Sequence, residues 1–452
     1  MKLRSLAGLV GLGMASLAAA FPIGADVKLG DIQSISNHGV VGGVYGYMIG
    51  SHTCNVGTAN LTWANNGTPG LAGNAYRLSD GRLVQIGLSF AKTACCAAAG
   101  TSSMCAVSCN GQGGSVLGVG CLDVYSSGWN SGQGRLAQRS AINAWTGAYG
   151  TYSTATGSAI FKQIQVPAAQ IGTANFPNAL YFVEGVYVAT DDAAGMKHNN
   201  NATYKRVTIN ASNAMALTGS PTNEPAIKAW RANGLGAGIM DPSVIDGVLD
   251  VPGEGRFHTA YKVTNLGGGQ YRYDYAVYNL SSDRSGGSFV VPVPNGVTVT
   301  NMGFNAPLYH SNEVYSNDPW TMTRGCTTVE FRSPQTFAQN ANTNALRWGT
   351  MYNFWFEANF PPAAGTASIG LFKPGTPTSL DMPASVPSGP ACTADVNCDG
   401  AANGNDVEAM ERAVGGDMSD YFLADPDFNG DGAVNGNDVE AVESVVGGGP
   451  CP

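Results

Sequence analysis

The last sixty or so residues contain the same twelve-residue segment twice, at 395–406 and, thirty-two positions later, at 427–438. Both copies place oxygen-bearing side chains at segment positions 1, 3, 5, 9 and 12, and both have Gly at position 6, where the absence of a Cβ permits a sharp turn. A loop with this spacing can wrap its side-chain oxygens and the backbone carbonyl of position 7 around a hard cation such as Ca²⁺. The sequence therefore predicts two calcium ions, with the ligands Asp395, Asn397, Asp399, Ala401, Asn403 and Asp406 in the first loop and Asp427, Asn429, Asp431, Ala433, Asn435 and Asp438 in the second.

A short apolar stripe follows each loop. Its members recur at i, i+3 and i+7, which is the spacing of one helix face, and a Gly-Gly pair then ends the stripe. Two in-register copies with matching helices argue against a chance acidic loop. The apolar residues are Val407, Met410 and Val414 after the first loop and Val439, Val442 and Val446 after the second.

With this repeat, residues 392–452 resemble a type I dockerin, the module that attaches a secreted protein to a cohesin receptor. The resemblance implies two Ca²⁺ ions, pseudo-two-fold symmetry and a cohesin-like receptor as partner. Asp stands at position 12 of both loops, whereas an ordinary calcium-sensor EF-hand has Glu there and a helix before the loop. Positions 10 and 11, which usually set the choice of partner, are Gly-Asn in both copies instead of the common Ser/Thr pairs, so the identity of the receptor stays open.

Negative charge is concentrated in this module. Residues 391–452 contain thirteen Asp or Glu and one basic residue, a net charge of −12, whereas the whole chain has a formal net charge of −9. The rest of the chain is nearly neutral, with no basic field for nucleic acid and no polybasic face for a membrane. Folding of the module should depend on calcium, because without cations its charges repel one another.

The first twenty residues predict an export signal. Lys2 and Arg4 precede an apolar run that ends in three alanines before Phe21. The run is too short to span a bilayer, so cleavage is favoured over anchoring, and no later stretch predicts a membrane span. We expect a secreted protein that is extracellular or associated with the cell surface.

Ten cysteines fit an oxidising compartment. Six lie close together without the CxxC pairs of a zinc site, so disulfides are favoured over structural zinc or copper, although His52 keeps a copper ligand as an alternative. Cys392 and Cys451 bracket the C-terminal module and should form a clasp, which leaves Cys326 and Cys398 as a link between domains or as free thiols. The six clustered cysteines are Cys54, Cys95, Cys96, Cys105, Cys109 and Cys121.

The fold class is predicted to be mainly β. From about residue 178 onward, short runs of alternating apolar and polar residues are separated by turn residues, which is typical of a β-sandwich. The clearest run is 271–278, where three tyrosines and a valine share one face and a Gly-Gly-Gly turn precedes them. One short helix is expected between Pro225 and Asn233.

A chain of this length needs more than one core. Five prolines within 374–391 disfavour both helix and central strand and predict an extended spacer. The expected organisation is a signal peptide at 1–20, a β-rich cysteine-containing domain at 21–250, a β-sandwich at 251–373, a Pro-rich linker at 374–391 and the dockerin-like calcium-binding module at 392–452.

No catalytic constellation stands out in the body, and neither Gly-x-Ser-x-Gly nor HExxH occurs. A glycosidase needs two facing carboxylates, for which Glu184 and Glu357 are the best candidates because both lie in apolar strand contexts. The alternative is that each is an ordinary strand residue. Asp191-Asp192 with Asn199-Asn200-Asn201 predicts either a further calcium loop or a solvated turn. The tyrosine-rich strand, with Trp320, Trp348 and Trp355, predicts either core packing or stacking on sugars.

Two hypotheses for the body follow. In the first it is a non-catalytic binding or structural component. In the second it is a carbohydrate-active enzyme or accessory protein in polysaccharide degradation, the kind of protein in which dockerins usually occur. The missing catalytic motifs favour the first. The body also resembles a family of secreted bacterial proteins through the phrases at 181–185, 276–280 and 344–349, and this resemblance implies no chemistry.

Overall fold

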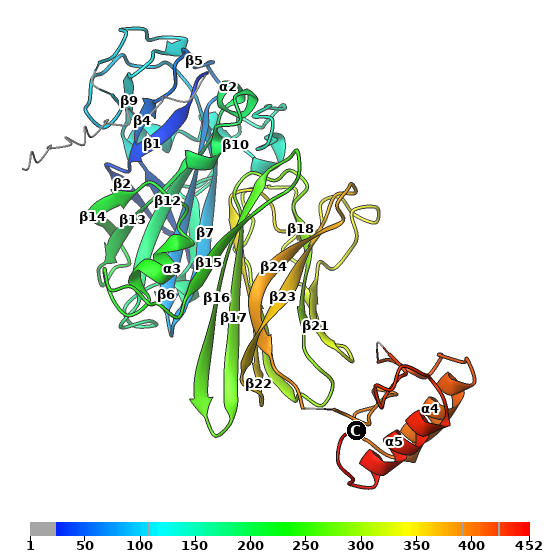
Figure 1. The fold of residues 1–452 in the computed structure, drawn as a ribbon. Coiled ribbons are helices and arrows are strands. Elements are labelled where there is room, and N and C mark those ends of the chain that lie inside the picture. Colours follow the sequence, from blue (N-terminus) through cyan, green and yellow to red (C-terminus); the bar gives the residue numbers. More distant parts are fainter. Residues whose placement is uncertain (1–23, 107, 391, 424) are drawn as a thin grey trace, which may run out of the picture.

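The computed structural model describes residues 24–106, 108–390, 392–423 and 425–452. The chain forms three stacked layers of β-sheet and a small helical module at one end (Figure 1). The fold is mainly β, as predicted. The predicted export signal lies outside the described residues, and among those described no helix is long and apolar enough to cross a membrane.

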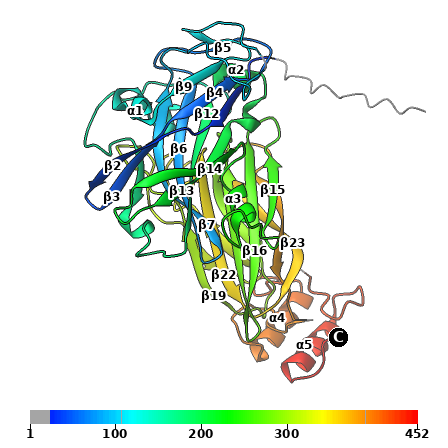
Figure 2. The ribbon, with the colours of Figure 1, turned by 90° about the vertical axis from the view of Figure 1, so that its left-hand side faces the viewer.

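The first layer is a nine-stranded antiparallel sheet. Its strands are β2 (Ile35–Val41), β3 (Val44–Ile49), β6 (Gly70–Ser79), β7 (Arg82–Thr93), β10 (Leu136–Ala137), β11 (Ile164–Pro167), β12 (Leu180–Val188), β13 (Ala202–Ile209) and β14 (Met215–Thr222). The order is β14-β13-β12-β6-β7-β11-β3-β2, with β10 paired to β7. The β2–β3 hairpin extends from the edge of this sheet (Figure 2).

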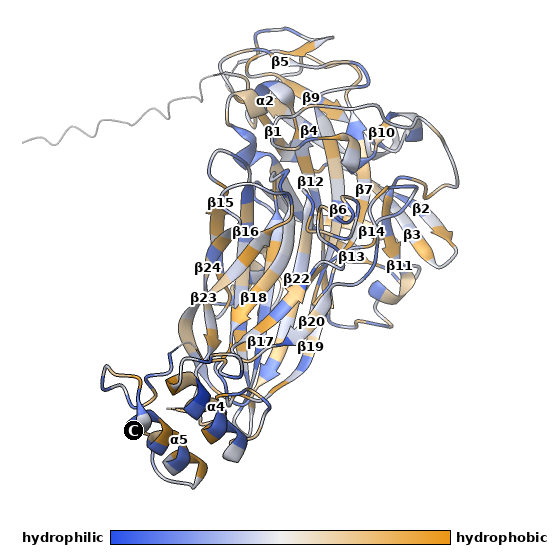
Figure 3. Cartoon of the chain, turned by 90° about the vertical axis from the view of Figure 1, so that its right-hand side faces the viewer, coloured by the Kyte–Doolittle hydropathy of each residue, from blue (hydrophilic) through white to orange (hydrophobic). Residues whose placement is uncertain are grey.

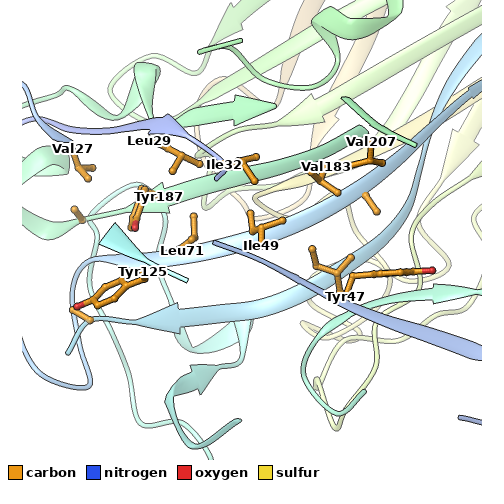
Figure 4. Packing of buried hydrophobic residues seen from close by; sticks show 14 of the residues in the cluster. Val27, Leu29, Ile32, Tyr47, Ile49, Leu71, Tyr125, Val183, Tyr187 and Val207 are labelled. Carbon is orange, nitrogen blue, oxygen red and sulfur yellow. The ribbon is translucent and has the colours of Figure 1, made fainter. Parts of the chain in front are cut away.

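A smaller sheet of β1 (Val27–Asp31), β4 (Ser51–Asn55) and β9 (Leu122–Tyr125) covers part of the first layer. Leu29 of β1 and Val183 of β12 belong to the core between them, with Ile32 between these two side chains (Figure 4). Gly185 of β12 makes this close packing possible, because an added Cβ would lie 2.4 Å from the Cδ2 atom of Leu29. A two-stranded sheet is formed by β5 (Leu61–Thr62), in the connection from β4 to β6, and β8 (Val116–Leu117), in the connection from β7 to β9.

The helices of the body are short. They are α1 (Ser127–Asn130), η1 (Gln133–Arg135), η2 (Arg139–Ala141), η3 (Ala168–Gln170), α2 (Thr190–Ala194), η4 (His198–Asn200) and α3 (Lys228–Asn233). The helix expected between Pro225 and Asn233 is confirmed as α3.

The second and third layers form the predicted β-sandwich. The second layer, in the order β15-β16-β17-β22-β19, contains β15 (Ile245–Asp250), β16 (Arg256–Gly267), β17 (Gln270–Asn279), β19 (Val299–Asn305) and β22 (Thr350–Ala358). The third, in the order β20-β21-β18-β23-β24, contains β18 (Gly286–Pro292), β20 (Thr321–Arg324), β21 (Thr328–Arg332), β23 (Pro362–Leu371) and β24 (Ser379–Pro387). Strand β15 lies before the predicted boundary at 251, so the sandwich begins earlier than expected.

The central strands of the second layer, β17 and β22, are covered on both faces over most of their length. Tyr273, Tyr275 and Val277 of β17 point into the sandwich core, which confirms the predicted shared face of this strand. Ala276 and Tyr278 point the other way and pack against the first layer. The two predicted body domains therefore share a continuous interface.

The structure corrects the prediction of a Pro-rich linker at 374–391. Residues 379–387 form β24, which pairs along its whole length with β23. The strand tolerates prolines because it lies at the edge of its sheet, where one side makes no ladder hydrogen bonds. Apolar side chains alternate along it and are buried in the sandwich core: Leu380, Met382, Ala384 and Val386.

The C-terminal module contains the two predicted helices, α4 (Gly404–Val414) and α5 (Gly436–Val446). Met410 of α4 and Val442 of α5 are completely buried in a small core that the helices share. Both helices carry a hydrophilic and a hydrophobic side (Figure 3).

Four disulfides connect eight of the ten cysteines. They are Cys54–Cys105, Cys109–Cys121, Cys326–Cys398 and Cys392–Cys451. The predicted clasp around the module is confirmed, and the open choice for Cys326 is decided as a link from the sandwich to the module. Cys95 and Cys96 are not bonded, although their sulfurs lie 3.1 Å apart, so two of the six clustered cysteines depart from the prediction. The other four clustered cysteines form disulfides with one another. Within the cluster, Cys95 and Cys96 therefore have only each other as partners, and they are adjacent in the chain.

Candidate functional site

Each predicted calcium loop closes onto the helix that follows it. Asp406, at position 12 of the first loop, is completely buried; its Oδ1 accepts the backbone N–H of Asn397 at 3.0 Å and its Oδ2 accepts that of Asn403 at 2.8 Å. Asp438 repeats both bonds in the second loop, at 3.1 and 2.8 Å. A capping box therefore begins each helix and satisfies N–H groups that have no partner within the helix.

The aspartates at position 1 differ between the loops. Asp395 accepts the N–H of Gly400 on Oδ2 at 3.2 Å, while its Oδ1 is buried without a partner. Asp427 accepts one N–H on each oxygen, from Asp431 at 3.0 Å and from Gly432 at 2.8 Å. An unpaired buried carboxylate oxygen is costly, and a cation is a partner that would satisfy it. The first loop fits a calcium ion on this observation.

The donor chemistry of both loops also suits calcium. Three carboxylates, two amides and one carbonyl per loop are hard oxygen ligands. Gly400 and Gly432 at position 6 have φ angles of 92° and 89°, the left-handed conformation that glycine adopts without a steric penalty. Over the described part of the chain, no group of three or more His, Cys, Asp or Glu side chains is gathered as a metal site, and the twelve ligands stay a prediction.

The first loop is also fastened to the sandwich. Cys398, at loop position 4, is bonded to Cys326, and the side-chain amide of Asn295 donates to the carbonyl oxygen of Asp395. A cleft of about 650 Å³ lies between the loop and the sandwich turns that contain these residues. Sequence reasoning missed Asn295, which lies a hundred positions from its partner.

The residues at loop positions 10 and 11 are exposed in both halves. Gly404 and Asn405 begin α4, and Gly436 and Asn437 begin α5. Both helix starts are therefore accessible to a partner.

Glu184, the first candidate catalytic carboxylate, is completely buried on β12. Its Oε2 accepts the hydroxyl of Tyr76 at 2.6 Å and the amide of Asn74 at 2.7 Å, and its Oε1 accepts the N–H of Ala226 at 2.7 Å. Burial raises the pKa of this carboxyl group. These bonds connect β12 to the segment before α3 and leave no face for a substrate.

Glu357, the second candidate, lies in a different sheet and is partly exposed. It accepts the amide of Asn301 at 2.7 Å. Because the two carboxylates have separate surroundings and do not face each other, the proposed catalytic pair is wrong. Each residue behaves as the structural alternative predicted.

The aromatic rings considered for sugar stacking are buried or, for the partly exposed Trp355, covered by another side chain. Trp320 is 3% and Trp348 4% exposed, and the guanidinium group of Arg82 covers the ring of Trp355 at 3.8 Å. Tyr273 and Tyr275 of β17 belong to the sandwich core, and Tyr271 packs against it. The core interpretation of these residues is the correct one.

Comparison with known families gives a match that falls on this module. Residues 393–446 match the model of the dockerin type I domain. The C-terminal module is a type I dockerin. Dockerins of this type bind calcium and cohesin partners, so the match agrees with the predicted class of metal and of partner.

Other comparisons say little about the body. A comparison with curated protein sequences gave no match. The chain shows a weak likeness to two solved structures. One is the exo-chitosanase CsxA of Amycolatopsis orientalis in complex with PNP-β-D-glucosamine. The other is the exo-β-D-glucosaminidase CsxA with a castanospermine and an australine analogue. Each is 8% identical, with 75% of this chain and 25% of that chain covered and a TM-score of 0.14. The chain spans a quarter of their length, and a likeness this weak carries no argument.

Proposed function

We propose that the protein is a secreted component that attaches through its dockerin, in the presence of calcium, to a cohesin-like receptor of an extracellular assembly or cell surface. The dockerin match at residues 393–446 is the observation that carries this proposal. The exposed helix starts at positions 10 and 11 of both loops provide two related surfaces for the receptor.

Calcium would act here as a folding cofactor. The module carries a net charge of −12, and Asp395 has a buried oxygen without a donor. One ion in each loop would offset this repulsion and hold the capping aspartates, Asp406 and Asp438, at the helix starts. Two ions per dockerin are therefore part of the proposal.

For the body we propose a binding or structural role, with polysaccharide as the class of ligand to test. A cleft of about 380 Å³ lies between residues 140–150 and the sandwich. One carboxylate lines it, that of Asp283, and it forms an ion pair with Lys373 at 2.8 Å. A glycosidase site needs two carboxylates, so this cleft does not favour the alternative of a carbohydrate-active enzyme.

Capture on immobilised type I cohesins tests the docking role. The full chain should bind in calcium and be released by EGTA, and Asp395→Ala/Asp427→Ala should abolish capture because each change removes a ligand and a charge from one loop. Asp417→Ala is the matched control, since Asp417 lies in the same module outside both loops. Capture that survives EGTA and the double change would contradict the proposal.

Incubation with a panel of polysaccharides tests the body. Sedimentation of the protein with a polysaccharide, without release of sugar, supports the binding role. Released sugar would support the enzyme instead, and neither binding nor release would favour a purely structural component.

A further inference from the structure

Four side chains with oxygen atoms lie at one end of the first layer, three of them buried and that of Asn200 partly exposed. Asp26 directly precedes β1, Asp192 lies in α2, Asn200 ends η4 and Asn201 follows it. Asp26 is 1% exposed, and Asp192 and Asn201 are 0% exposed. The solvated turn considered for this sequence holds only in part, since Asn199 is exposed and Asp191 partly exposed, whereas Asp192 and Asn201 are buried.

The contacts place these side chains in one cluster. The amide of Asn200 donates to Oδ1 of Asp26 at 2.9 Å, and the amide of Asn201 donates to Oδ2 of Asp192 at 2.8 Å. The backbone N–H of Val27 donates to Oδ1 of Asp192 at 3.0 Å. The Asp192 carboxylate therefore lies against the backbone beside Asp26.

Three oxygens of this cluster have no hydrogen-bond partner: Oδ2 of Asp26, Oδ1 of Asn200 and Oδ1 of Asn201. Among the described residues, none of the ion pairs involves Asp26 or Asp192. Buried carboxylates normally pair with a cation or coordinate a metal, because an ionised group without a partner is costly to bury.

The charges around the cluster do not remove this cost. Burial raises the pKa of Asp26, although Lys197 and Lys28 lower it from outside hydrogen-bond contact. Burial also raises the pKa of Asp192 to about 7; the bonds from Asn201 and Val27 lower it, the charge of Asp26 raises it, and that of Lys197 lowers it. Both carboxyl groups lack the positive partner that a folded protein usually provides.

We propose that Asp26, Asp192, Asn200 and Asn201 hold a calcium ion in the N-terminal domain, separate from the two dockerin loops. Two carboxylates and two amide oxygens are hard ligands, and the oxygens without a hydrogen-bond partner have free lone pairs that can coordinate such an ion. Calcium fits better than magnesium, because magnesium dehydrates reluctantly and usually keeps several waters, which a buried cluster does not accommodate. The ion joins the start of β1 to the connection between β12 and β13.

Asp191 is a matched control beside the site. It is partly exposed, and its Oδ2 accepts the N–H of Thr62 at 2.7 Å, away from the cluster. Asp191→Asn makes the same chemical change one residue from Asp192 and should leave the ion in place.

Calcium per chain, counted by elemental mass spectrometry after dialysis into calcium-free buffer, tests the site. Asp26→Asn/Asp192→Asn should lose one calcium per chain, both in the native background and in Asp395→Ala/Asp427→Ala. This difference does not depend on how many ions the dockerin holds, so failure of the docking proposal would not imitate failure of this one. Equal calcium content with and without the two Asp→Asn changes would overturn it.

Thermal unfolding provides the second readout. With an ion bound, the Asp→Asn changes remove ligands and lower the melting temperature of the body; in an ion-free cluster they remove buried charge and raise it. If these variants do not fold, the test uses the Asp395→Ala/Asp427→Ala variant, which keeps the proposed site in the body. EGTA should lower the melting temperature of the body in this variant, and an unchanged value would overturn the proposal.

Discussion

Asp274 is the buried carboxylate that joins the first and second layers, and its removal should destabilise the body strongly. It is 0% exposed; Oδ1 accepts Nε–H of Arg82 from β7 at 2.7 Å, and Oδ2 accepts Nε–H of Arg272 at 2.7 Å. Asp274→Ala leaves two guanidinium groups at the interface without a counter-ion, and breaking a buried pair in this way costs about 3–5 kcal/mol. Because the arginine side chains keep 18% and 21% exposure, we expect the lower end, about 3 kcal/mol.

Urea unfolding followed by tryptophan fluorescence measures this loss. Asp250→Ala is the matched control, because Asp250 pairs with Arg256 at 2.6 Å on the same layer but is 60% exposed. Exposed pairs contribute about 0–1 kcal/mol, so its unfolding midpoint should barely move. Equal shifts for Asp274→Ala and Asp250→Ala would refute the argument that burial makes the first pair essential.

Three further outcomes are expected. Gly185→Ala should lower the free energy of unfolding by about 1–3 kcal/mol, because the new Cβ meets Leu29; an unchanged melting temperature would show that β1 shifts freely. Burial lowers the pKa of His258 from 6.5 to about 3, so stability present above pH 6.5 is lost as the pH falls toward 3, by about 2 kcal/mol between pH 6.5 and 5. His258→Asn should remove that part of the pH dependence of urea unfolding, and an identical slope would contradict it. Cys326→Ser/Cys398→Ser should release the dockerin from the sandwich and increase the radius of gyration in small-angle scattering, whereas an unchanged radius would mean that other contacts hold the module.

Much of the local structure was predictable from neighbouring residues. Tyr271, Tyr273 and Tyr275 of β17 alternate with other residues, and the structure places these three on one face. The loops and helices of the dockerin repeat at a fixed interval, so their spacing predicted the loops and helices; the resemblance and the family match then identified the module. The alternation at Leu380, Met382, Ala384 and Val386 could have revealed β24, but the prolines between them concealed it.

The candidate sites likewise include features that neighbouring residues predict and features that depend on distant residues. The ligand types of the calcium loops follow from positions within twelve residues, whereas the surroundings of Glu184 depend on Tyr76, Asn74 and Ala226, which are far from it in the chain. An apolar strand context marked Glu184 as costly to bury, but only the packed layers show that three donors hold it. Glu357 lies in a similar strand context, but the structure leaves it partly exposed with one donor, Asn301.

The sequence by itself determined the β character of the body, the helical dockerin and the oxygen-rich chemistry of its loops, because hydrophobic periodicity, turn residues and ligand spacing act over a few residues. Tertiary structure alone decided that the central strands of the second layer are covered on both faces, that Cys398 is bonded to Cys326 and that Asp26 meets Asp192. These contacts join residues separated by 72 positions for the two cysteines and by 165 for the bond from Val27 to Asp192. Such distances are closed by the packing of whole sheets, and no local propensity specifies which distant side chains then meet.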